Sequence, residues 1–116
     1  MHDTPATVLL FRTNGLGSTD VADLPPRLAA SFLHLLREGD MRPNAICFYT
    51  DGVRLACTGS TVLEPLREME AAGVRLILCS TCLETLGLRD QVQVGIVGGM
   101  GDILTAIWEA DKVVSL

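Results

Sequence analysis

The sequence contains few aromatic residues, no long apolar run and no excess of basic charge. Its 116 residues include three Phe, one Tyr and one Trp, so the core has to be built mainly from aliphatic side chains. The formal net charge of −5 at pH 7 argues against a nucleic-acid-binding surface. No apolar run approaches the roughly 20 residues that cross a membrane. We therefore expect neither a nucleic-acid partner nor a membrane partner.

The first ten residues have no basic start and no small-residue cleavage site, which argues against a secretory signal. We therefore expect a cytoplasmic protein, in which thiols stay reduced. The four cysteines are then better interpreted as core, metal-binding or reactive groups than as a disulfide framework.

Short apolar runs alternate with helical patterns along the whole chain, which predicts a single α/β domain over residues 1–116. Continuous apolar runs are typical of parallel strands that are covered on both faces. We expect a three-layer α/β/α sandwich with a mostly parallel sheet of about five strands. The predicted strands are residues 7–11, 45–50, 74–79, 92–97 and 112–116, the last at an edge.

Between these strands, helical spacing predicts which side chains face the core. The segment 53–57 is ambiguous, and we expect a short extra strand or a ribbon there. Asp23 is expected to cap the first helix, and Thr58 or Ser60 the second. The predicted inward-facing residues are Leu28, Phe32, Leu35 and Leu36 in the first helix, Val62, Leu66 and Met69 in the second, and Ile103, Ala106, Ile107 and Ala110 in the last.

Cys79 and Cys82 form a C-x-x-C pair where the third predicted strand passes into a short helix. In a parallel sheet the strand-to-helix loops emerge at one edge, where open α/β sheets bind ligands. Amides at the start of that helix would favour a thiolate at Cys79 if they pointed at its sulfur. We therefore expect Cys79 to be the reactive thiol, with Cys82 as a resolving or passive neighbour.

Three other interpretations of this pair stay open. Structural zinc needs four ligands, and the remaining candidates are Cys47, Cys57, His2 and His34, so we expect no metal. A redox dithiol fits the position, but no proline follows Pro65 to supply a facing turn. A buried core thiol is the plainest interpretation of Cys79, and we assign Cys47 and Cys57 to the core.

Glycine-rich loops follow the first and fourth predicted strands. Neither loop matches a dinucleotide-binding motif, so no cofactor is expected. Their amides could still surround an anion next to Cys79. The candidate binding residues are Asn14, Gly15, Gly17, Ser80, Thr81, Gly98, Gly99 and Met100.

The chain resembles the DsrE-like sulfur-relay superfamily, and most of all the C-terminal domain of YedF-type "sulfurtransferase-like, selenium metabolism" proteins. The motifs that carry the resemblance are NGLGSTD, FYTDGVRL, TGSTVLEPLREMEAAGV, ILCSTCLETLGL, VGIVGGM and EADKVVSL. The resemblance implies a DsrE-like fold, a persulfide on the cysteine after the third strand, here Cys79, and homo-oligomers that are trimers or hexamers. Ser80 departs from the glycine that is usual at that position.

Such proteins usually carry an N-terminal TusA-like domain, so we expect a separate TusA-like carrier to dock in its place. The leading hypothesis is a sulfurtransferase-like relay protein that carries sulfur, or selenium, on Cys79. The alternatives are a redox dithiol and a non-catalytic oligomeric binding module with structural cysteines. Leu104 and Trp108 lie off the inner face of the last predicted helix, which suggests oligomer contacts.

Overall fold

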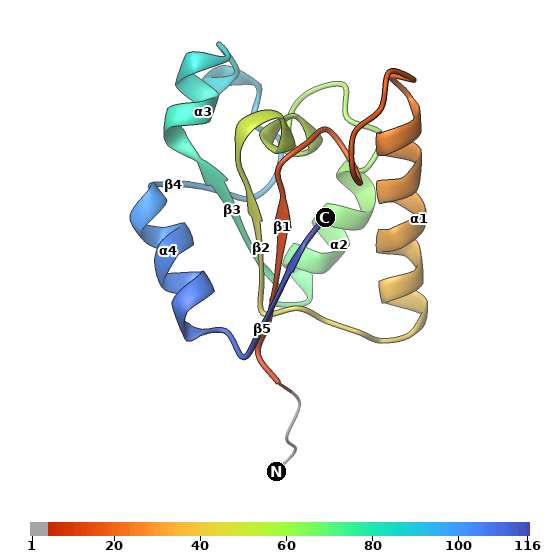
Figure 1. The fold of residues 1–116 in the computed structure, drawn as a ribbon, viewed down its shortest axis with the longest axis vertical. Helices are drawn as coiled ribbons and strands as arrows, with labels where there is room; N and C mark the ends of the chain where they lie inside the picture. The colour runs from red at the N-terminus through yellow and green to blue at the C-terminus, as the bar shows by residue number, and fades with distance from the viewer. Residues whose placement is uncertain (1–4) are drawn as a thin grey trace.

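A five-stranded, all-parallel sheet organises residues 5–116, which are the residues that the computed structural model describes (Figure 1). The strand order is β4-β3-β2-β1-β5, so β4 and β5 form the two edges. The strands are β1 (Thr7–Phe11), β2 (Ala45–Phe48), β3 (Arg75–Cys79), β4 (Ile96–Gly98) and β5 (Lys112–Ser115). The helices are α1 (Leu24–Glu38), α2 (Leu63–Ala71), α3 (Ser80–Thr85) and α4 (Met100–Glu109), with 3₁₀ helices η1 (Thr50–Ala56) and η2 (Arg89–Gln91).

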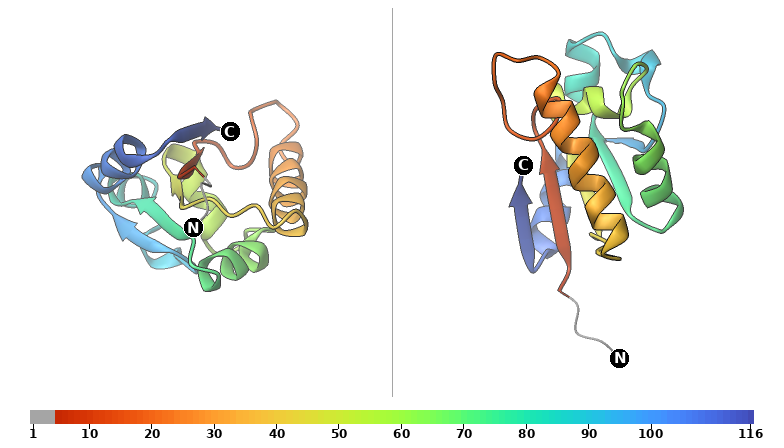
Figure 2. Two further views of the ribbon diagram at one scale, coloured as in Figure 1. Left: turned by 90° about the horizontal axis from the view of Figure 1, so that it is seen from below. Right: turned by 90° about the vertical axis from the view of Figure 1, so that its right-hand side faces the viewer.

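Helices cover both faces of the sheet, which confirms the predicted α/β/α layering. α1 and α2 lie on one face and α4 on the other (Figure 2). The register aligns Leu9 with Ile46 and Leu76, whose exposed fractions are at most 4%. The central strands are thus buried as their unbroken apolar sequences indicate.

The predicted inner face of α1 is right for Phe32 and Leu36, which pack partly buried against the core, and wrong for Leu28 and Leu35. Ala29 and Leu33 are fully buried, whereas Leu28 and Leu35 are 44% and 62% exposed. The buried stripe of α1 therefore passes through Ala29 and Leu33 rather than through Leu28 and Leu35. The inner residues of α2 and the buried Ile103 and Ala106 of α4 agree with the helical spacing.

The helix starts agree only partly with the sequence. Asp23 occupies the expected position before α1, but its side chain makes no capping hydrogen bond. Ser60 accepts a hydrogen bond from the amide of Val62 at 3.1 Å and so supports the start of α2.

The ambiguous segment 53–57 is neither a strand nor a ribbon but lies largely within η1, which packs over the end of β1. A Cβ atom built on Gly52 would lie 2.0 Å from the carbonyl oxygen of Phe11. β4 is shorter than predicted because Gly95 has φ +86° and Val92 makes only an isolated bridge to Cys57. Among the described residues, no helix combines the length and apolarity that crossing a membrane requires.

The close approach of η1 to β1 predicts a large stability cost for Gly52→Ala. The added methyl would overlap backbone atoms that cannot move independently of the sheet, so we expect a loss of about 1–3 kcal/mol or more. Gly101→Ala is the matched control, because its Cβ meets nothing within 4 Å and alanine favours the helix. Urea unfolding of both variants measures the difference. Equal stability of the two variants would contradict this account of Gly52.

Candidate functional site

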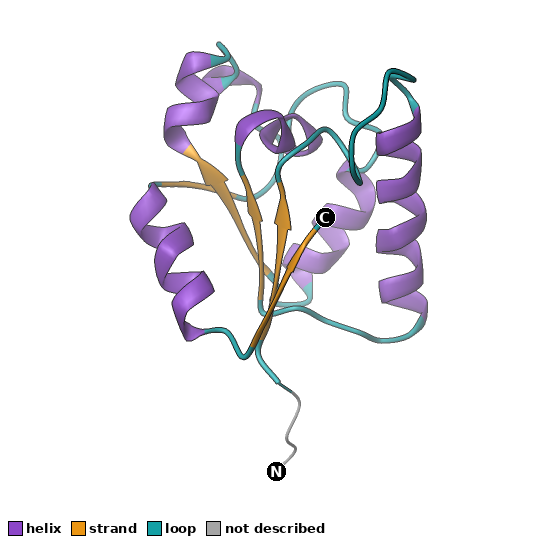
Figure 3. Cartoon of the chain, in the orientation of Figure 1, coloured by secondary structure: helices purple, strands orange, loops and turns teal. Residues whose placement is uncertain are grey.

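The loops that follow the strands gather at one edge of the sheet, as a parallel arrangement requires (Figure 3). Within this edge, β3 ends at Cys79 and α3 begins at the next residue. η1 contacts both β3 and α3. The thiol pair therefore lies next to the segment that follows β2.

The expectation that Cys79 is exposed and receives helix amides is wrong. The residue is 2% exposed, and no hydrogen bond from an α3 amide to its side chain caps the helix. Cys79 still belongs to β3, where it pairs with Gly98 of β4, so its side chain lies in the core. α3 has only six residues. Cys79 therefore lacks the accessible, amide-bound sulfur that the sequence suggested.

Cys82 has both properties that Cys79 lacks. It is partly exposed, and its sulfur accepts a hydrogen bond from the backbone amide of Thr50 at 3.1 Å. It also lines a hollow of about 240 Å³. The other lining residues are Thr50, Asp51, Thr81, Thr85 and Leu86.

Thr50 has a strained backbone that aims its amide at the sulfur. Its φ is +48°, a rare conformation for a β-branched residue. The Thr50 hydroxyl is near the carbonyl oxygens of Tyr49, at 2.7 Å, and of Arg12. Strained backbone of this kind often occurs at functional sites. Sequence reasoning missed Thr50 as a site residue, although its position after β2, next to the end of β3, could have identified it.

The environment of Cys82 raises the pKa of its thiol above the ordinary 9.0. Burial is the largest cause, and a side-chain hydrogen bond with Cys79 adds to it. The Thr50 amide acts in the opposite direction, because it stabilises the thiolate. At neutral pH most Cys82 side chains are therefore thiols.

The loop after β1 forms a second hollow, of about 340 Å³, beside the first. Asn14 and Gly17 line it together with Arg54, and Asp51 borders both hollows. The Arg54 guanidinium is held by Asp51 at 2.9 Å. Gly15 has a packing role, because a Cβ there would lie 2.0 Å from the Pro25 carbonyl.

The remaining candidates belong to other parts of this edge. Ser80 opens α3, and Gly98 pairs with Cys79 in the sheet. The Gly99 amide donates to the Asp102 carboxylate at 2.9 Å, while Met100 starts α4 and is 58% exposed. Of the eight predicted binding residues, only Thr81 lines the hollow that contains Cys82.

The other two cysteines are buried, which confirms their assignment to the core. Burial raises the pKa of the Cys47 thiol to about 11, and Cys57 donates to the Val53 carbonyl. Across residues 5–116, His, Cys, Asp and Glu side chains form no cluster of three or more that could hold a metal ion. His2, a candidate zinc ligand, lies outside the described residues.

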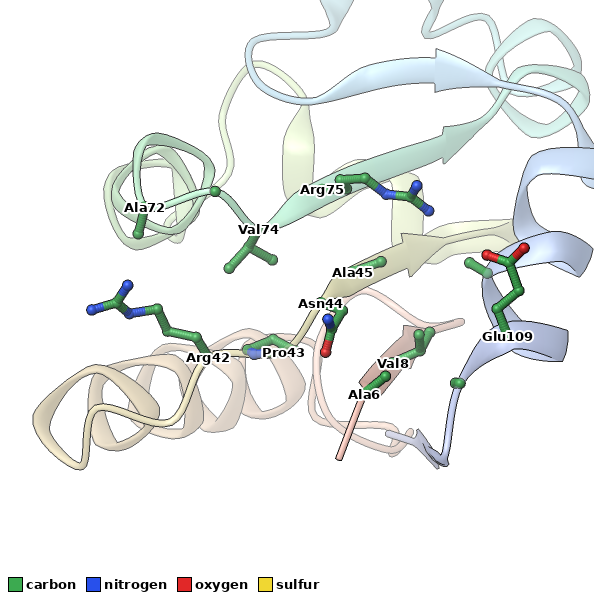
Figure 4. A pocket seen from close by; sticks show the side chains of 13 residues that line it. Ala6, Val8, Arg42, Pro43, Asn44, Ala45, Ala72, Val74, Arg75 and Glu109 are labelled. Atoms are coloured by element: carbon green, nitrogen blue, oxygen red, sulfur yellow. The ribbon is translucent and has the colours of Figure 1, made fainter. Parts of the chain in front are cut away.

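A further hollow, of about 500 Å³, lies at the opposite ends of the strands (Figure 4). Its lining includes Arg42, Arg75 and Glu109, together with Val8 and Ala45 near the starts of their strands. It contains neither a cysteine nor any of the predicted site residues.

A family model, that of the DsrE/DsrF-like family, matches residues 26–116. The chain belongs to the DsrE/DsrF-like family. This match confirms the superfamily resemblance, and the family is generally linked to sulfur relay. A search of curated proteins found no significant match.

Similar solved structures support the same fold. The Escherichia coli YchN protein is 22% identical, with a TM-score of 0.68 over 97% of this chain and 100% of its own. A protein of unknown function from Methanobacterium thermoautotrophicum is 19% identical, with a TM-score of 0.65 over 96% and 99%. One from Bacteroides thetaiotaomicron is 19% identical, with a TM-score of 0.65 over 95% and 94%.

The exposure of the four thiols predicts selective alkylation of Cys82 in the folded protein. Its raised pKa means that the thiolate fraction is small at pH 7 and grows as the pH rises, so the rate should still be increasing at pH 9. Iodoacetamide labelling followed by peptide mass spectrometry measures this profile. Faster labelling of Cys79 than of Cys82, or a labelling rate that levels off below pH 8, would contradict this prediction. Labelling of the denatured protein is the control for the intrinsic reactivity of each thiol.

Proposed function

We propose that the protein relays sulfur and that Cys82 accepts it as a persulfide. The single observation that carries this assignment is the placement of the Cys82 sulfur, which lines a hollow and accepts a backbone amide from Thr50. Membership in a family linked to sulfur relay supports the class of chemistry. Cys79 is then a buried neighbour rather than the first acceptor.

The transfer consists of two displacements. The Cys82 thiolate attacks the outer sulfur of a donor persulfide, and the donor thiolate leaves. An acceptor thiolate then attacks the outer sulfur on Cys82, which leaves as a thiolate. The Thr50 amide stabilises the Cys82 thiolate before the first displacement and after the second. Because nucleophilicity rises with thiol pKa, the small thiolate fraction is partly offset by its higher reactivity.

The hollow leaves room for the reacting groups. Its volume of about 240 Å³ is well above the roughly 30 Å³ that one water molecule occupies in the liquid. A bound sulfur atom and the end of a donor cysteine side chain can therefore be placed there together. A TusA-like carrier is the partner that the YedF-type resemblance suggests, and selenium is an alternative cargo.

A binding module without transfer chemistry is the second candidate. The raised pKa of Cys82 and the burial of Cys79 favour it, because the Cys82 sulfur is mainly a thiol at neutral pH and the Cys79 side chain is not exposed. Under this alternative, the two adjoining hollows would hold a small ligand and the cysteines would only pack.

Persulfide loading separates the candidates. Reduced protein treated briefly with inorganic polysulfide should gain the mass of one sulfur atom, and Cys82→Ser should lose that adduct because the accepting sulfur is absent. Cys57→Ser is the matched control, with a buried thiol removed, and should load normally.

Loading of Cys82→Ser at the native level would show that Cys82 is not the acceptor, and its loss in Cys79→Ser alone would return the role to Cys79. No adduct on the native protein would favour the binding module.

We also propose that α4 supplies a contact between copies of the chain. Met100, Leu104 and Trp108 follow one another at a four-residue spacing, and Trp108 is 82% exposed. Ile96, on the edge strand β4 that precedes α4, is also 58% exposed. Burying such a surface would give the homo-oligomer that the DsrE-like resemblance implies, with a trimer or hexamer as the expected size.

Trp108→Glu should therefore reduce the oligomer to smaller species, because a carboxylate cannot be buried there without a partner. Light scattering coupled to size-exclusion chromatography measures the mass. Leu28→Glu is the control, since Leu28 is an exposed leucine on α1, across the sheet. The same mass for the native protein and Trp108→Glu would exclude this surface as the contact.

A further inference from the structure

We infer that Cys79 is a resolving thiol, which discharges the persulfide on Cys82 as hydrosulfide and closes a Cys79–Cys82 disulfide. This inference rests on the proposed persulfide on Cys82. It adds a second outcome for the bound sulfur, namely reduction to hydrosulfide instead of transfer to a partner.

The positions of the two residues bring their side chains together. Cys79 is the N-cap of α3 and Cys82 is the third residue of the helix. Residues three apart on a helix are neighbours on its surface, so the two side chains lie close together. Here no side-chain capping hydrogen bond forms, so no helix amide holds the Cys79 thiol, which lies one helical turn from Cys82. Cys79 is 2% exposed, so a reagent in solution reaches it poorly while Cys82 lies beside it.

The same arrangement determines which sulfur Cys79 attacks. In a persulfide on Cys82, the inner sulfur is the present Cys82 sulfur, which lies one helical turn from Cys79. The outer sulfur needs new space, and the hollow next to Thr81 and Leu86 provides it. Cys79 therefore meets the inner sulfur, whereas an external acceptor meets the outer one.

The step balances without an external oxidant. The Cys79 thiol gives its proton to water, and its sulfur bonds to the inner sulfur of Cys82. The bond between the inner and outer sulfurs breaks, and the outer sulfur leaves with the electron pair as hydrosulfide. The outer sulfur is reduced, and the two cysteines are together oxidised to a disulfide. A dithiol reductant then restores both thiols.

The experiment follows a loaded protein over time. Reduced protein is loaded with inorganic polysulfide, desalted and sampled by intact-mass spectrometry, while a fluorogenic thiol trap measures hydrosulfide. We expect the sulfur adduct to disappear as a species two hydrogens lighter than the reduced protein appears, with one hydrosulfide released per adduct. Peptide mapping should locate the new bond between Cys79 and Cys82.

Cys79→Ala and Cys79→Ser should load normally, keep the adduct and lose most of the hydrosulfide release. Two variants are used because serine places a hydroxyl in a buried position, and circular dichroism confirms that at least one is folded. Cys57→Ser should discharge like the native protein.

Native-rate release from folded Cys79→Ala, or a stable adduct on the native protein, would overturn the resolving role and leave the proposed loading intact. Loading that persists in Cys82→Ser, or that never occurs, would overturn the proposed function itself, and the resolving role with it.

Discussion

The parallel pairing of β2 with β3 is the constraint on which the thiol site depends. Its register places Phe48, the last residue of β2, beside Leu78, so β3 ends one residue further on at Cys79. The chain leaving β2 then turns at Thr50, while the chain leaving β3 turns into α3. The Thr50 amide consequently meets the Cys82 sulfur across two segments that are far apart in sequence. Slipping this pairing by one residue would separate donor and acceptor.

The fold was largely predictable because the apolar pattern is simple. Unbroken aliphatic runs at the centre of the sheet have only one stable environment, which is burial on both faces. Because a helix separates each strand from the next, the strands run parallel. The loops that follow them therefore meet at one edge of the sheet. α1 was harder, since apolar residues occur around much of its circumference. The face that is buried runs through Ala29 and Leu33, while Leu28 and Leu35 point away from the core.

The candidate site was predictable only to the level of the C-x-x-C pair and its edge. The spacing puts two thiols one helical turn apart, but it does not say at which residue the strand becomes a helix. Because β3 extends through Cys79, the first thiol is carried into the core and the second is left at the surface. Thr50 was missed because an amide has no sequence signature: its position after β2 puts it at this edge, but the backbone conformation is needed to show where the amide points.

The strained turn at Thr50 also gives a segment outside the C-x-x-C pair an influence on the acidity of the Cys82 sulfur. The Thr50 side chain lies against the chain end of β1 at the Arg12 carbonyl, while its amide reaches the sulfur on α3. A designer could therefore retune the ionisation of this sulfur by reshaping the β1 terminus.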